Sequence, residues 1–228
     1  MGKYLGHATV LKTMSHPLLG RRMYVPCDFE YFKQAPGGKL PSTQNCLREF
    51  RDSKDGTIAL EAYAGSGVLT LIYLDEGYTP LLIEQEKGLV KALKKNINRY
   101  ALNPRGVQCF HADNMIILPG IASNSRGIGV IDLDSYTSCI PQIKEAARIL
   151  TRGLLFISSG EIRTVCRFKN TAFIKKRYDI VFNGPWRNFP QDVIYKFARQ
   201  VFAARGKKIE LVHTFVWPTV CRLCIRIG

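Results

Sequence analysis

The stretch IALEAYAGSGVLTLIYLDEG, residues 58–77, decides how this chain folds. Three small residues, Gly65, Ser66 and Gly67, stand between an apolar run typical of a strand and a longer one typical of a helix. Because glycine carries no side chain, a ligand can approach the peptide groups and the helix N-terminus there directly. A nucleoside cofactor fits this geometry, and so does a tight strand-to-helix turn that binds nothing.

Strand and helix patterns alternate outward from this loop. The expected strands are residues 57–63, 79–84, 106–110, 126–134 and 153–159, and the expected helices are residues 68–74, 85–100, 138–150 and 192–206. Two β-rich runs, residues 208–217 and 219–228, flank Pro218 and predict a final antiparallel hairpin. The sequence therefore predicts an α/β fold with a mostly parallel seven-stranded sheet, helices on both faces and a C-terminal antiparallel hairpin.

Composition limits the class of protein. A chain of 228 residues with 46% hydrophobic residues can bury a sizeable core, and we expect one large domain. Its apolar runs, such as residues 68–74, are far shorter than the roughly 20 residues that cross a bilayer. The first residues lack the layout of a secretory signal, and seven scattered cysteines are typical of reduced thiols, so we expect a cytoplasmic protein without a membrane partner.

The cysteine pair Cys221 and Cys224 has the spacing of zinc ligands. The surrounding sequence predicts a strand, in which positions three apart face opposite sides. A tetrahedral metal site needs converging ligands, and no second Cys or His pair is close in sequence. We therefore favour a structural role for the pair and predict no metal.

Positive charge is concentrated at one end of the chain. Of the formal net charge of +15, residues 1–56 contribute +4, residues 57–160 contribute +1 and residues 161–228 contribute +10. This asymmetry favours a protein in which the basic part of the chain binds a polyanion and the nearly neutral part binds a small ligand. A basic surface can also serve solubility alone. We expect residues 1–56 to be an irregular extension and residues 57–228 to be the functional domain, with residues 161–228 facing nucleic acid.

Acidic residues follow the expected strands at the edge where open α/β sheets bind ligands. Glu84 ends the second strand, where a carboxylate can accept hydrogen bonds from both ribose hydroxyls. Asp113 follows the third strand and can receive the amino group of an adenine, or can simply cap a helix. Asp132 and Asp134 end the fourth strand. A nicotinamide cofactor is the obvious competitor, but Thr70 stands where its third glycine is expected.

The glycine-rich loop and the acidic residues at the strand ends together resemble those of the class I S-adenosylmethionine methyltransferases. The resemblance extends from about Thr57 to Gly228. The resemblance implies S-adenosyl-L-methionine as cofactor, EAYAGSG as its loop, Glu84 as the ribose ligand and Asp113 as the adenine ligand. The expected cofactor-binding residues are Glu61, Tyr63, Ala64, Gly65, Ser66, Gly67, Glu84, Gln85, Asp113, Asn114 and Asp132.

The fourth-strand motif DLDSYT, residues 132–137, is similar to the Asp-Leu-Asp-Pro-Tyr-Gly motif of the tRNA guanine-N2 dimethyltransferase family. RMYVPCDFEYF, residues 22–32, resembles that family's Phe-Tyr-Asn-Pro segment, and residues 213–228 resemble the end of its catalytic domain. The resemblance is to the catalytic domain without the C-terminal domain. Ser135 stands where the family has proline, and Thr137 where it has glycine.

An exocyclic amine on a base is a poor nucleophile, so the site must orient its lone pair. Asp134 can accept a hydrogen bond or proton from the amine, and Tyr136 can stack on the base or be a half-buried aromatic residue. Ser135 either loosens the loop or offers a hydroxyl to the base. We expect the catalytic residues to be Asp132, Asp134, Ser135 and Tyr136, acting on a flipped or unpaired base.

The basic C-terminal third is expected to contact phosphates, although charge runs are usually just solvated faces. The expected nucleic-acid-binding residues are Arg163, Arg167, Lys169, Lys175, Lys176, Arg177, Trp186 and Arg187. The sequence predicts an S-adenosylmethionine-dependent methyltransferase acting on a base, with guanine N2 in tRNA as the leading substrate. The alternatives are a DNA or ribosomal RNA amino-methyltransferase and a non-catalytic RNA-binding module.

Overall fold

A seven-stranded sheet forms the centre of the computed structural model, which describes residues 11–16, 18–26, 38–51, 56–101, 106–135, 137–168 and 171–228. In spatial order the strands are β5 (Gln108–His111), β4 (Thr79–Glu84), β3 (Ile58–Glu61), β6 (Ile128–Ser135), β7 (Gly153–Ser159), β9 (Val220–Ile227) and β8 (Ile209–Trp217). The first five are parallel, and β9 is antiparallel to both β7 and β8. The predicted fold class is confirmed.

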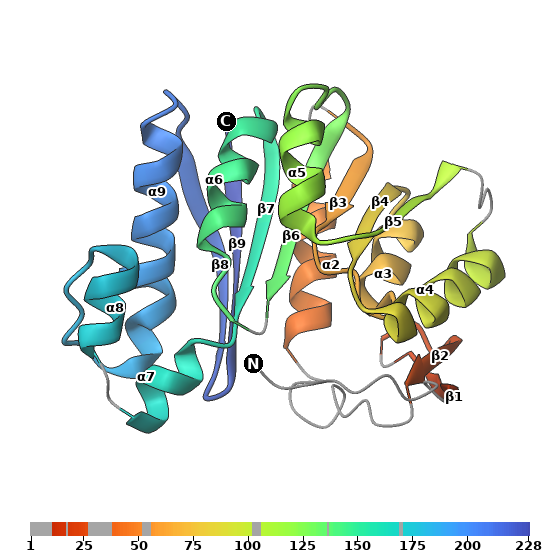
Figure 1. Cartoon of the computed structure of the whole chain (residues 1–228), viewed down its shortest axis with the longest axis horizontal. Coiled ribbons are helices and arrows are strands. Elements are labelled where there is room, and N and C mark those ends of the chain that lie inside the picture. The colour runs from red at the N-terminus through yellow and green to blue at the C-terminus, as the bar shows by residue number, and fades with distance from the viewer. Residues whose placement is uncertain are drawn as a thin grey trace.

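Helices cover both faces of this sheet (Figure 1). On one face lie α5 (Asn114–Ala122), α6 (Ile140–Ile149) and α9 (Lys196–Ala203), and on the other lie α2 (Lys39–Glu49), α3 (Val68–Asp75) and α4 (Lys87–Tyr100). Two large apolar clusters and a smaller third one, under α4, fill the spaces between these layers among the described residues. The periodicity of α4 is the predicted one, because Val90, Leu93 and Ile97 are buried while its lysines are exposed.

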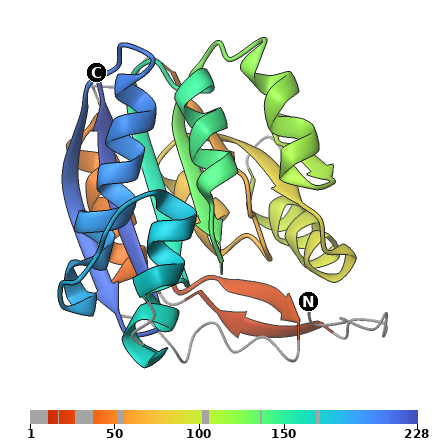
Figure 2. The ribbon, with the colours of Figure 1, turned by 60° about the vertical axis from the view of Figure 1, so that its left-hand side comes forward.

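The described part of the N-terminal segment is regular rather than irregular, so that part of the prediction is wrong. Strands β1 (Leu11–Ser15) and β2 (Arg22–Pro26) form an antiparallel ribbon, and α2 packs on β8 and β9. Figure 2 shows the ribbon running beneath the sheet. The prolines and glycines before α2 suggested a loop, but Pro41 lies in the first turn of the helix, where a missing N–H group is tolerated.

Besides α2, three further helices went unrecognised in the sequence. Helix α5 is apolar around its whole circumference and contains Pro119, so it has no helical periodicity. Helices α7 (Ile162–Phe168) and α8 (Thr171–Tyr178) lie in the basic segment that was interpreted only as polar. Short 3-10 and π-helical turns, Trp186–Asn188 and Pro190–Tyr195, lead from there into α9.

The cysteine pair of β9 faces opposite sides of the sheet, as expected for positions three apart in a strand. Cys221 belongs to the apolar cluster on one face, and Cys224 belongs to the cluster on the other. Across the described residues, no group of three or more potential ligands is placed to hold a metal ion. No helix in the same part of the chain is long and apolar enough to span a membrane.

Candidate functional site

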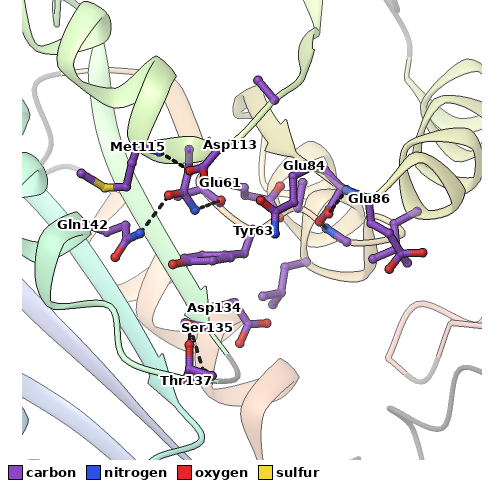
Figure 3. A pocket seen from close by; sticks show the side chains of 18 of the residues that line it. Glu61, Tyr63, Glu84, Glu86, Asp113, Met115, Asp134, Ser135, Thr137 and Gln142 are labelled. Atoms are coloured by element: carbon purple, nitrogen blue, oxygen red, sulfur yellow. Dashed lines mark hydrogen bonds between the residues drawn. The ribbon is translucent and has the colours of Figure 1, made fainter. Parts of the chain in front are cut away.

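A cavity of about 780 Å³ opens at the edge of the sheet where the parallel strands end (Figure 3). It is lined by most of the residues predicted to bind a cofactor or to act in catalysis: Glu61, Tyr63, Ala64, Gly65, Ser66, Glu84, Gln85, Asp113, Asn114, Asp134 and Ser135. Lining residues that the sequence did not single out include Val68, Leu69, Glu86, Leu89, Met115, Thr137, Ser138 and Gln142. The predicted Gly67 and Asp132 are not among the lining residues.

The glycine-rich loop has backbone geometry that requires glycine. Gly65 and Gly67 have φ values of 57° and 89°, in the left-handed region that disfavours other residues. Gly67 is the N-cap of α3, and a Cβ atom there would lie 2.8 Å from Leu93 Cδ1. The loop is therefore a sharp strand-to-helix turn that presents backbone to the cavity.

Glu84 fastens this loop from the neighbouring strand. Its Oε2 accepts a hydrogen bond from the Gly65 N–H group at 2.8 Å, and its Oε1 accepts one from the Glu86 N–H group at 2.8 Å. The side chain also lines the cavity. Because an ionised carboxylate offers about four acceptor sites, Glu84 can hold the loop and still receive hydroxyl groups from a ligand.

Several buried polar atoms of the cavity-lining residues have no hydrogen-bond partner among the residues that the structure describes. These atoms are Glu61 Oε1, Ser66 Oγ and Gln142 Oε1. Burial, reinforced by the nearby Asp132, raises the pKa of Glu61 well above the usual range of a glutamate. Buried polar groups are normally satisfied, so orphaned atoms around one cavity indicate a polar ligand or ordered water.

Asp113 is a helix N-cap, one of the two roles considered for it. Its Oδ1 accepts a hydrogen bond from the Met115 N–H group at 2.8 Å, and the side chain also lines the cavity. The next residue, Asn114, donates to the Ala62 carbonyl oxygen at 2.9 Å and accepts from Gln142 Nε2 at 2.8 Å. The start of α5 is thereby tied to the end of β3.

Asp132 and Asp134 are separated by one residue on β6 and lie in different surroundings. Asp132 is 1% exposed, and its carboxylate accepts hydrogen bonds from Arg222 Nη1 at 3.0 Å and Nη2 at 2.7 Å. The Tyr73 hydroxyl donates to the same carboxylate at 2.6 Å. Asp134 lines the cavity and forms an ion pair with Lys39 of α2.

Ser135 stabilises the turn that follows β6. Its Oγ accepts a hydrogen bond from the Thr137 N–H group at 3.1 Å and lies 3.3 Å from the Thr137 hydroxyl. A serine at this position therefore restrains the turn through a local hydrogen bond. Tyr136 itself lies outside the described residues, and its expected stacking role stays a prediction.

Comparison with known proteins places this geometry in a structural class. No protein-family model and no curated protein sequence matches the chain. Among solved structures, 96% of the chain superimposes on Trm1 from Pyrococcus horikoshii in complex with S-adenosyl-L-methionine, with a TM-score of 0.72 and 13% identity. The chain has the class I methyltransferase fold. It spans 61% of the length of that Trm1 chain.

Two further structures share the class I methyltransferase fold with this chain. One is TYW2 from P. horikoshii in complex with MeSAdo, with a TM-score of 0.60, 13% identity, and coverage of 98% of this chain and 73% of that one. The other is Trm5b from Pyrococcus abyssi, with a TM-score of 0.60, 14% identity, and coverage of 98% and 57%. Identities this low establish the shared fold alone.

The predicted nucleic-acid-binding residues that the structure describes are not among the residues that line the cavity. Arg163 and Arg167 are exposed on α7, and Lys175, Lys176 and Arg177 are exposed on α8. Arg177 pairs with buried Glu161 and lies 4.5 Å from the ring centroid of Phe173, while Arg187 lies 5.1 Å from that of Trp186. Lys169 lies outside the described residues.

Trp217 is an aromatic residue that the sequence did not single out. It is 49% exposed at the end of β8, beside the turn to β9. Its neighbour Val216 pairs with Cys221, which pairs with Ser159 at the end of β7, and Ser159 pairs with Ser135. Trp217 therefore lies at the same edge of the sheet as the cavity. The turn lies beside α7 in both views (Figures 1 and 2).

Proposed function

We propose that this chain is an S-adenosylmethionine-dependent methyltransferase acting on an exocyclic amine of a nucleic-acid base, with guanine N2 in tRNA as the substrate. The observation that carries the proposal is Asp134, which ends β6 in the DLDSYT motif and lines the same cavity as the glycine-rich loop. Trm1, a tRNA guanine-N2 dimethyltransferase, shares the fold and supports this choice of base and RNA.

The cavity residues fit the proposed cofactor. The Gly65 to Gly67 loop would hold the amino-acid part, Glu84 the ribose hydroxyls, and Asp113 the adenine amino group. The orphaned atoms of Glu61, Ser66 and Gln142 would gain polar partners from the same ligand. When bound, S-adenosylmethionine supplies a methyl group on a positively charged sulfur.

Asp134 would bind the amine that receives the methyl group. A carboxylate that accepts a hydrogen bond from one amine N–H fixes the nitrogen lone pair in direction. As the nitrogen gains positive charge in the transition state, the same carboxylate offsets it, and the displaced proton then leaves to solvent. Ser135 and Thr137 would keep this part of the loop in place through their own hydrogen bond.

The catalytic edge of the sheet would also guide the RNA. Residues 161–228 carry a net charge of +10, and α7, the helix that carries Arg163 and Arg167, lies next to the β8–β9 turn. Trp217 and Ser135 are on strands three spacings apart, which corresponds to about 14 Å across the sheet. That separation suits an unpaired nucleotide stacked on Trp217 close to a target base flipped into the cavity.

The test is transfer of a labelled methyl group to tRNA, ribosomal RNA and duplex DNA in parallel, followed by nucleoside mass spectrometry. We expect N2-methylguanosine in tRNA, reduced by roughly 10²- to 10⁴-fold in Asp134→Ala. Label found only in DNA or only in ribosomal RNA would contradict tRNA as the substrate and would favour a DNA or ribosomal RNA amino-methyltransferase. Cofactor binding without transfer to any of the three would identify a non-catalytic module.

A further inference from the structure

Lys39, the first residue of α2, reaches the Asp134 carboxylate across 95 positions of sequence. Only 3% of the Lys39 side chain is exposed, against 19% for Asp134. Lysine is among the residues least often buried, and a buried ammonium group requires a charged or hydrogen-bonded partner. Asp134 lines the cavity and Lys39 does not, so the lysine contacts the carboxylate from outside the ligand space.

The first turn of α2 is held in position by hydrogen bonds that reach it from strand β9. The Thr43 hydroxyl donates to the Lys39 carbonyl oxygen at 2.8 Å, and Arg222 Nε of β9 donates to the Thr43 hydroxyl at 2.9 Å. Arg222 Nη1 also donates to the Ser158 hydroxyl at 2.9 Å. The backbone of the helix that carries Lys39 is therefore anchored to the centre of the sheet beside Asp134.

Within the described part of the chain, the charged groups that act on Asp134 come from four elements. Lys39 of α2 and Arg222 of β9 are positive, whereas Asp132 of β6 and Glu61 of β3 are acidic. Burial alone would raise the pKa of Asp134, but Lys39 and Arg222 outweigh it, so that this pKa is lowered overall. Glu61, which forms no ion pair with another described residue, has a raised pKa in the same cavity.

We propose that Lys39 is a positioning residue that holds Asp134 as an oriented carboxylate, ready to accept a hydrogen bond from the amine of the target base. This inference rests on the proposed function. It makes α2 part of the catalytic site, although α2 lies outside the domain of residues 57–228 expected from the sequence. Asp134 then acts as an acceptor that stays ionised at acidic pH, with the proton of the amine released to solvent.

The experiment compares Lys39→Met, which removes the charge, with Lys39→Arg, which keeps it. In methyl transfer to tRNA, Lys39→Met lowers kcat at neutral pH by roughly 10- to 100-fold, the size typical when an orienting partner is lost. The acidic limb of its pH profile also moves to higher pH, because Asp134 loses the charge that keeps it ionised. Lys39→Arg keeps the wild-type position of this limb.

Lys207 provides the matched control, because it is a structural lysine far from the cavity. Its Nζ donates to the carbonyl oxygens of Ala147 and Leu150 at the end of α6, at 2.7 and 2.8 Å. Lys207→Met should lower thermal stability and leave the pH profile unchanged. Equal loss of activity in both Lys39 variants without any movement of the acidic limb would contradict the positioning role.

A second readout separates this inference from the proposed function. Carboxyl carbon NMR of Asp134 follows its ionisation directly, in protein without substrate. We expect Asp134 to titrate at higher pH in Lys39→Met than in wild type, and near the wild-type position in Lys39→Arg. Unchanged titration in Lys39→Met overturns the inference even if methyl transfer is observed, while an absence of transfer with the expected titration shift overturns the proposed function alone.

Discussion

The two carboxylate sites of β6 have the same kind of partner and serve different ends. Asp132 is hydrogen-bonded by Arg222 and Tyr73 and is not among the cavity-lining residues, whereas Asp134 is paired with Lys39 and lines the cavity. Both pairs join β6 to a distant part of the chain. In our proposal, the same kind of ion pair joins elements of the fold at Asp132 and orients the proposed catalytic carboxylate two residues further on.

The largest expected effect concerns the ion pair between Arg222 and Asp132. Arg222→Met leaves the Asp132 charge buried without its partner, so the free energy of unfolding should fall by about 3–5 kcal/mol. Urea unfolding monitored by circular dichroism measures the change. The control is Arg226→Met, which removes an exposed arginine of the same strand paired with Glu210 and should cost less than about 1 kcal/mol. If the free energy of unfolding falls by a similar amount in the two variants, the buried pair of Arg222 and Asp132 does not stabilise the fold more than an exposed pair does.

The second effect concerns the cofactor side of the cavity. Glu84→Gln weakens the charged hydrogen bonds that hold the Gly65 N–H group and that would receive the ribose hydroxyls. Such bonds contribute about 1.5–3 kcal/mol, so the Kd for S-adenosylmethionine should rise by roughly tenfold to a hundredfold in calorimetry. Glu210→Gln, on the exposed edge strand β8, should leave the Kd unchanged. An unchanged Kd in Glu84→Gln would remove Glu84 from the cofactor site.

The third effect extends the comparison to the surface. Trp217→Ala should weaken binding of tRNA by about 1–3 kcal/mol, as expected when a stacking residue is removed. Phe110→Ala is the control, because Phe110 is 37% exposed on β5, at the opposite edge of the sheet. Fluorescence anisotropy with labelled tRNA measures both. If both substitutions weaken tRNA binding equally, Trp217 does not stack on the RNA as proposed.

The smallest effect concerns His16, a buried histidine beside the glycine-rich loop. His16 Nδ1 accepts from the Leu18 and Leu19 N–H groups at 3.2 and 3.0 Å, so Nε2 carries the proton that Val68 O accepts at 2.9 Å. Burial is the main cause that lowers the pKa of His16; the hydrogen bond to Val68 and the nearby Asp75 raise it less, and Arg21 lowers it further.

A lowered pKa means that the unfolded chain binds the proton more readily than the folded one. The contribution of His16 to stability is therefore complete above about pH 6.5 and is lost as the pH falls. The free energy of unfolding should decrease from pH 7.5 to pH 5.5, and His16→Gln should flatten part of this slope. Exposed His213 is the control, and an equal flattening in His213→Gln would contradict the assignment.

Much of the fold and of the cavity was predictable because it depends on local patterns. Strand ends were visible as apolar runs followed by acids, so Glu84, Asp113 and Asp134 could be expected at one edge of the sheet. The glycine-rich loop was equally visible, since its positive φ angles require glycine at positions 65 and 67.

The missed features depend on long-range packing. Nothing in the local sequence shows that Lys39 meets Asp134, or that Arg222 meets Asp132 across 90 positions. Asp132 was expected at the cavity because it lies at the C-terminal end of a predicted strand, but it pairs with the arginine from β9 instead. The exposure of Trp217 follows from the place of β8 at the sheet edge, which sequence alone did not assign.

The most direct test of the account is a single-turnover methyl transfer from S-adenosylmethionine to tRNA by wild-type protein and by Asp134→Asn, with cofactor binding measured on both. We predict N2-methylguanosine from wild type, and loss of transfer in Asp134→Asn with the cofactor still bound. Transfer by Asp134→Asn at the wild-type rate would contradict the central role of Asp134. Cofactor-loaded wild type that methylates no guanine would contradict the proposed reaction.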